Sequence, residues 1–110
     1  MSLVGAKSML IKELLETKEY INLKKTKERL DKNTEYKTRT IEFEKKTDIF
    51  RLKRNNNEDT KELFDEIEEE YINLTSIKEI NDYFQAVRAM NNLVSGIFDD
   101  IHLTINVNLL

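Results

Sequence analysis

The chain has 110 residues, of which 35% are charged and 39% hydrophobic, and its net charge is −3. This balance is too apolar for a disordered chain and is typical of a thin helical bundle with much solvated surface. It contains no Cys, which excludes disulfides, thiolate metal sites and cysteine nucleophiles. Because Pro is absent and Gly occurs only twice, we predict an all-α fold and a single domain over residues 1–110.

The start of the chain has no basic segment followed by an apolar stretch, and no apolar run approaches the roughly 18 residues that a membrane helix needs. We therefore expect a cytoplasmic protein that makes no membrane contact.

The first predicted helical segment covers about residues 4–31 and carries an apolar cluster at helical spacing. Thr17 precedes Lys18 and Glu19 and suits the N-cap of a new helix. The segment is thus either one helix or two helices with a bend near residue 17. The cluster consists of Leu10, Ile11, Leu14 and Leu15.

Two further helices are predicted at about residues 34–54 and 58–73, separated by the loop Asn55–Asn57. Asn33 is a favourable N-cap for the first of them. Both carry a 3–4 repeat on one face. The repeats are Tyr36, Thr40, Phe43, Thr47 and Phe50 in the first helix, and Phe64, Ile67, Tyr71 and Leu74 in the second.

A long final helix is predicted at about residues 77–101, followed by a flexible tail at 104–110. The tail alternates apolar and polar residues and is free to fray, to extend the helix or to pair with another segment. Ser76 and Glu79 have the spacing of a capping box, in which each side chain satisfies an NH group at the helix start. The complete prediction is an elongated antiparallel bundle of four to five helices with a long C-terminal helix.

The final helix carries a long apolar stripe, which other helices of the same chain or of a partner must cover. Asn91 is its polar member, and a polar residue in such a stripe can set the register between helices. The alternative is that Asn91 occupies a partly exposed position or forms a local intrachain hydrogen bond. We expect a homodimer or higher homo-oligomer, or a hetero-complex with other regulators. The predicted interface residues are Ile80, Phe84, Val87, Asn91, Val94, Phe98 and Ile101.

Charge is distributed unevenly along the chain: residues 1–54 carry +6 and residues 55–110 carry −9. One interpretation is charge complementarity between packed halves, within or between chains. The alternative is an RNA-binding face in the basic half. Its candidate contacts are Lys24, Lys25, Arg29 and Lys32.

No catalytic constellation is recognisable, and we predict no enzyme activity and no cofactor. Asp99 and His102 have the spacing of a carboxylate–histidine pair in di-iron helical bundles. Such a site needs two pairs of this kind, and His102 is the only histidine. We therefore expect no metal site.

The final helix contains a run of aromatic, Asn and spaced Ile residues. The residues are Tyr83, Phe84, Gln85, Ala86, Asn91, Asn92, Leu93, Val94, Ile97 and Ile101. This run resembles the final helix of the YlbF/YmcA family of small bacterial regulators, in which an aromatic-Leu-x-Ala step precedes a Leu-Asn-x-Leu-Leu step and spaced Ile residues. The segment from Thr17 to Asp31 and the helix from Tyr36 to Phe43 fit as well, so the resemblance covers about residues 5–102.

The resemblance implies an all-helical, elongated fold that self-associates. It also implies a regulatory role in competence, sporulation and biofilm formation, linked to RNase Y. Some members of the family hold an iron–sulfur cluster through Cys, which this chain lacks. We therefore predict a non-enzymatic regulator or adaptor without a cluster, and the alternative is an RNA-binding accessory module.

Overall fold

The computed structural model describes all 110 residues as five α-helices without any strand, which confirms the predicted all-α fold. The first predicted segment is divided in two at Glu16–Thr17. The helices are α1 (Leu3–Leu15), α2 (Lys18–Asp31), α3 (Thr34–Asn55), α4 (Lys61–Thr75) and α5 (Lys78–Asn108).

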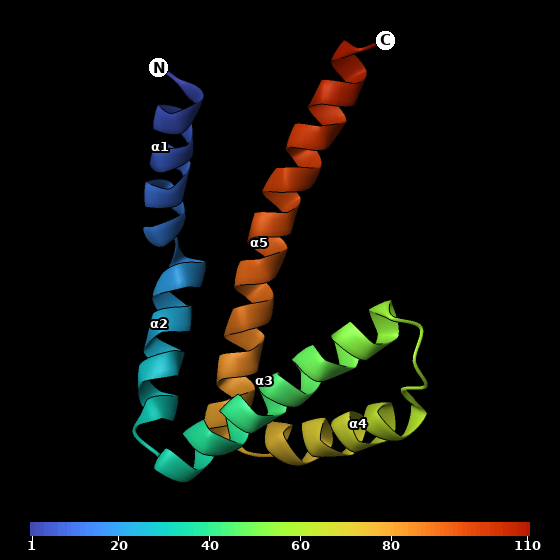
Figure 1. The fold of residues 1–110 in the computed structure, drawn as a ribbon. Helices are drawn as coiled ribbons and strands as arrows, with labels where there is room; N and C mark the ends of the chain where they lie inside the picture. Colours follow the sequence, from blue (N-terminus) through green and yellow to red (C-terminus); the bar gives the residue numbers. More distant parts are fainter.

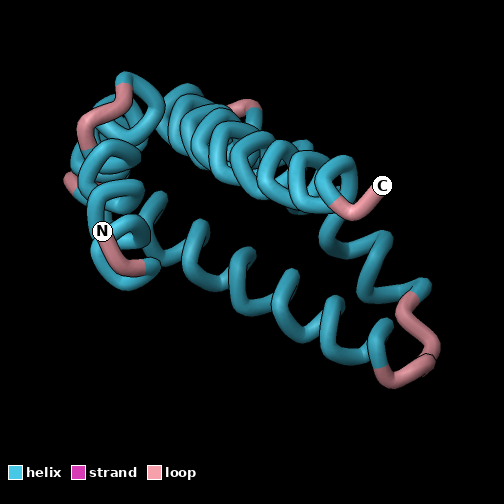
Figure 2. The backbone as a smooth tube through the Cα atoms, turned by 90° about the horizontal axis from the view of Figure 1, so that it is seen from above, coloured by secondary structure: helices cyan, strands magenta, loops and turns pink.

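The helices form a V with two unequal arms (Figure 1). One arm consists of α1 and α2 in succession, with α5 running in the opposite direction beside α2 and diverging from α1; the other is the α3–α4 hairpin. Figure 2 shows the molecule from above, with the loop between α3 and α4 at the opposite end of the hairpin from the N-terminus. The radius of gyration is 17.8 Å, against about 13 Å for a compact domain of this length. The fold is therefore elongated, as predicted.

The hydrophobic core is small and lies where the two arms meet. Only six of the 110 residues are buried, and the three that are fully buried form the core cluster, Leu30, Leu74 and Ile80. They come from the end of α2, the end of α4 and the start of α5. Because these helix ends are held together at the vertex, the rest of each arm is packed on fewer sides. Partly buried side chains that surround the cluster are Tyr36, Phe43, Ile77, Tyr83 and Phe84.

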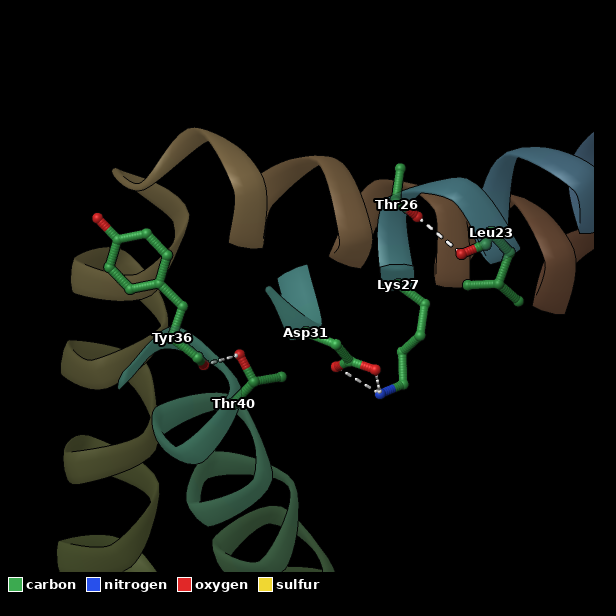
Figure 3. A network of polar contacts seen from close by, with 6 residues as sticks. All are labelled: Leu23, Thr26, Lys27, Asp31, Tyr36 and Thr40. Carbon is green, nitrogen blue, oxygen red and sulfur yellow. Dashed lines mark hydrogen bonds and ion pairs between the residues drawn. The ribbon is translucent and has the colours of Figure 1, made fainter. Parts of the chain in front are cut away.

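Polar residues within the packed region satisfy their hydrogen bonds locally (Figure 3). The buried hydroxyls of Thr26 and Thr40 donate to the carbonyls of Leu23 and Tyr36, at 2.9 and 2.8 Å. No buried side-chain nitrogen or oxygen lacks a partner. Thr at these positions therefore costs no unsatisfied hydrogen bond.

Two predicted helix starts are confirmed. The Thr17 hydroxyl accepts from the backbone NH of Tyr20 at 3.2 Å, and Asn33 accepts from Tyr36 at 3.1 Å.

The predicted capping box at Ser76 and Glu79 is wrong. The Ser76 hydroxyl donates to the carbonyl of Asn73 at 2.6 Å, so it completes the end of α4 instead. The N-cap of α5 is Ile77, which has no side-chain cap.

Two helix boundaries also differ from the prediction. Helix α4 begins at Lys61 and not near residue 58, because residues 56–58 cap α3: the NH of Glu58 donates to the carbonyl of Lys53, and Asn57 has a φ of 60°. Helix α5 does not end near residue 101 but continues to Asn108, so most of the predicted tail is helical. The chain has no Pro, and no Gly after Gly96, so nothing ends the helix earlier.

Candidate association surface

The stripe on α5 changes from buried to exposed along its length. Ile80 is fully buried in the core, and Phe84, Val87 and Val94 are partly buried. Asn91 is exposed, and so are Phe98 and Ile101. The first of the seven predicted interface residues is thus enclosed by its own chain, and the last turns of the stripe are free.

The free part of the stripe is the distal α5 face, defined here as Phe98, Ile101 and Ile105. These side chains are 54%, 43% and 54% exposed. Other apolar side chains near both chain termini are exposed as well. Three large apolar residues at helical spacing on one exposed face are characteristic of an association surface. Further exposed apolar residues near the two chain termini are Leu3, Val4, Leu103, Val107 and Leu109.

The surface area of the chain measures how much of it is left uncovered. The solvent-accessible surface is 8601 Å², whereas a compact monomer of 13.1 kDa exposes about 6,400 Å². The excess of about 2,200 Å² exceeds the roughly 800 Å² per partner that a standard protein interface buries. One copy therefore has ample surface for a stable interface.

A groove between α3 and α5 continues the same surface toward the vertex, and sequence reasoning did not predict it. Twelve residues line a cavity of about 460 Å³. Its floor includes Phe43, Tyr71 and Phe84, whose ring centroids lie 5.7–6.2 Å apart. The only signal in the sequence was that Phe43 and Phe84 each belong to the apolar repeat of their helix. This does not reveal that α3 and α5 diverge beyond these two rings.

The rim of this α3–α5 groove is polar and charged. Glu44 and Asp48 line it from α3, and Arg88 and Asn91 line it from α5. Partial burial raises the pKa of the Glu44 carboxyl above its usual value, although the charge of Lys27 opposes the shift. Arg88 donates to the Tyr71 hydroxyl at 2.9 Å. Asn91 therefore lies at the edge of an open groove and outside the intrachain core.

The uneven charge of the chain is partly matched within the molecule. Ion pairs join the basic half to the acidic half at 3.8–4.0 Å. This observation supports charge complementarity between packed halves. The pairs are Arg29–Asp82, Arg39–Glu70 and Lys46–Glu66.

The four candidate RNA contacts lie on α2 or at its end. Lys24, Lys25 and Lys32 are exposed and form no ion pair. Arg29 lies 3.9 Å from Asp82, so one of the four charges is already near a carboxylate of α5.

Asp99 and His102 are both exposed on α5. The structure contains no group of three or more His, Cys, Asp or Glu side chains arranged to hold a metal ion. None of the five helices combines the length and the apolar character needed to cross a membrane.

Comparison with known proteins identifies one family. The sequence profile described as "Control of competence regulator ComK, YlbF/YmcA" matches residues 6–106. No curated protein and no solved structure matches the chain significantly. The profile covers α2, α3 and α4 completely and most of α1 and α5, including the distal α5 face. The chain therefore belongs to the YlbF/YmcA family of competence-control regulators.

Proposed function

We propose that this protein is a non-enzymatic regulator that acts by binding protein chains through the distal α5 face, and that it self-associates there. The observation that carries this proposal is the exposure of Phe98, Ile101 and Ile105 on a helix whose earlier turns are packed. Exposed apolar surface of this extent costs free energy in water, and an interface removes that cost.

Sedimentation equilibrium tests self-association directly. We expect the full chain to be a dimer or larger oligomer at tens of micromolar. The variant Phe98→Asp should shift it toward monomer, because a charge in the centre of an apolar interface must be desolvated. Ile72→Asp is the matched control, since Ile72 is 64% exposed on α4. A wild-type protein that stays monomeric at this concentration would remove the self-association part of the proposal.

The family resemblance extends the proposal to regulators linked to RNase Y. Affinity capture of the tagged protein from its host, with Phe98→Asp as the comparison, tests this link. Loss of specific partners in the variant is expected if they bind the distal α5 face or require the self-associated form. Unchanged capture of RNase Y by the variant would place that contact elsewhere.

RNA binding remains a second candidate, since Lys24, Lys25 and Lys32 are exposed without ion-pair partners. Phosphate contacts release counterions, so binding should weaken steeply as salt rises. A titration of single-stranded RNA with the wild type and with Lys25→Glu, at low and moderate salt, tests it. Equal binding by both proteins, or no binding at low salt, would rule out this site.

A further inference from the structure

We propose that α1 is the second half of the self-association surface, and that two copies pack antiparallel, α1 on α1 and distal α5 on distal α5, as a four-helix bundle. This inference rests on the proposed self-association and adds a helix and a geometry to it. Helix α1 has no buried residue, although it carries several large apolar side chains. A helix of 13 residues is marginally stable in water without packing, so α1 needs a partner.

Helix α1 carries two apolar columns. Leu10 and Leu14 are half-buried, so they mark the side that faces the rest of the chain, where α5 runs past α1 (Figure 1). The second column lies about a quarter of a turn further round the helix and is exposed, since successive residues advance by about 100°. This outer column of α1 consists of Val4, Ser8, Ile11 and Leu15, and its three apolar members are 70%, 49% and 48% exposed.

Helix α5 has the same arrangement. Met90, Leu93 and Ile97 are half-buried on the side that packs on α2, and the distal α5 face lies about a quarter of a turn further round. Two antiparallel helices that face each other turn in opposite senses when both are viewed from one end. Equal turns therefore bring the outer column of α1 and the distal α5 face to the same side of the arm. In a four-helix bundle each helix packs on two neighbours in this way.

The first half of α5 shows what covers this side near the vertex. Phe84 and Val87 line the α3–α5 groove there, and Phe43 of α3 packs on Phe84 with ring centroids 5.7 Å apart. A second copy bound in parallel would bring its own α3–α4 hairpin to the same level on the same side, where the two hairpins obstruct each other. An antiparallel copy places each hairpin beyond the free end of the other arm.

The spacing of both columns has the symmetry that an antiparallel pair requires. A two-fold axis perpendicular to the helices pairs residues that lie at equal distances on either side of it. On α1 the axis is level with the Met9–Leu10 bond, and on α5 with the Asp99–Asp100 bond. Each column residue is then opposite another column residue, and Ser8 is the only polar one among them. The opposed pairs are Val4 with Leu15, Ser8 with Ile11, Val94 with Ile105, and Phe98 with Ile101.

The two axis positions lie at similar heights on the arm, as one common axis requires. Arg29 of α2 lies 3.9 Å from Asp82 of α5, so these residues are level on the antiparallel helices. About 20 residues from this pair toward the free ends lead to Met9 on one side and to His102 on the other. His102 is within one helical turn of the Asp99–Asp100 bond, so a single axis fits both columns.

The exposed area and the number of helices favour a second copy as the partner. The excess of about 2,200 Å² over a compact monomer exceeds the roughly 800 Å² that each partner of a standard interface buries. A single foreign helix would cover only one of the two columns. A second copy supplies two helices of the same length, and the two-fold contact closes the assembly at a dimer.

Charge insertion on opposite sides of α1 tests this surface by sedimentation equilibrium. Ile11→Asp should raise the dissociation constant of the dimer about tenfold or more, because the carboxylate must be desolvated. Met9→Asp is the matched control, since Met9 is 51% exposed on the far side of α1 against 49% for Ile11. It should change the dissociation constant less than about twofold. On α5, Leu103→Asp is the corresponding control for Phe98→Asp.

Spin-label distances test the antiparallel arrangement, and the absence of Cys makes single-cysteine labels specific. The two labels in the Ser8→Cys dimer should be offset by about 5 Å along the arm, because Ser8 lies beside the axis. In the Glu16→Cys dimer the offset should be about 20 Å at 1.5 Å per residue. Pulsed electron paramagnetic resonance should therefore give a clearly shorter distance for Ser8→Cys. A parallel pair would give similar distances at both sites.

The outcomes separate this inference from the proposed self-association. A dimer that Phe98→Asp weakens and Ile11→Asp does not, or that Met9→Asp weakens as much as Ile11→Asp, would overturn the role of α1 and leave self-association intact. Similar distances at the two labelled sites would overturn the antiparallel geometry alone. A wild-type chain that stays monomeric in sedimentation would overturn both proposals.

Discussion

At the scale of single residues, burial separates apolar side chains that look equivalent in the sequence. Leu74 and Leu52 occupy helices of similar composition, yet Leu74 is fully buried and Leu52 is 63% exposed. Likewise Ile80 and Ile101 belong to the same stripe, and only Ile80 lies in the core. The energetic role of an apolar residue in this thin fold therefore depends on its distance from the vertex.

Leu74→Ala should lower the free energy of unfolding by about 2–5 kcal/mol, because it leaves a cavity among residues that cannot fully close it. Leu52→Ala should change it by less than about 0.5 kcal/mol. Urea unfolding monitored by circular dichroism measures both. Equal effects of the two substitutions would contradict the small core described here.

Glu44→Gln should stabilise the protein at pH 7. Burial raises the pKa of Glu44 above 4.5 in the folded state, so ionisation opposes folding. The stabilising effect of protonation is complete below pH 4.5 and is lost as pH rises through the raised pKa.

The advantage of Glu44→Gln over the wild type should therefore grow between about pH 4 and pH 7. Unfolding free energies at several pH values measure it. Glu42→Gln, on the same helix but outside the groove lining, controls for the loss of one carboxylate. An advantage that shrinks with rising pH would contradict the stated cause.

At the scale of helices, the helix starts differ in whether a side chain caps them. Asn33 and Thr17 accept backbone hydrogen bonds at the starts of α3 and α2, whereas Ile77 gives α5 no side-chain cap. Helix α5 starts without one because Ile77 and Ile80 pack at the vertex, and burial there replaces the cap in fixing its first turn.

Asn33→Ala should cost about 1 kcal/mol of folding free energy, since the NH of Tyr36 loses its acceptor. Ser76→Ala should cost less, because the Ser76 hydroxyl caps no helix start. Denaturant unfolding of the two variants compares these costs. A larger loss for Ser76→Ala would indicate that the capping box forms in solution.

At the scale of the whole molecule, the two arms of the V touch only at the vertex. The inner sides of the V and the distal α5 face are therefore left uncovered. The excess of about 2,200 Å² over a compact monomer expresses this shape as area. Self-association and stability should consequently be coupled, since a partner that binds only the folded chain shifts the unfolding equilibrium.

The melting temperature should rise with protein concentration for the wild type and stay nearly constant for Phe98→Asp, because only the associating protein gains stability from its partner. Calorimetry over a hundredfold range of concentration measures this. The same concentration dependence in both proteins would show that Phe98 is not part of the interface.

Sequence by itself determined the helical class, the breaks at Thr17 and Asn33 and the apolar stripe, because these follow from local spacing, capping chemistry and the absence of Pro. Only the tertiary structure decided which part of the stripe is covered. The packing of α2, α3 and α4 around the vertex encloses Ile80, and their divergence exposes Phe98 and opens the groove. Periodicity identifies the face of a helix that must be buried, but the angles between helices determine whether its own chain buries it.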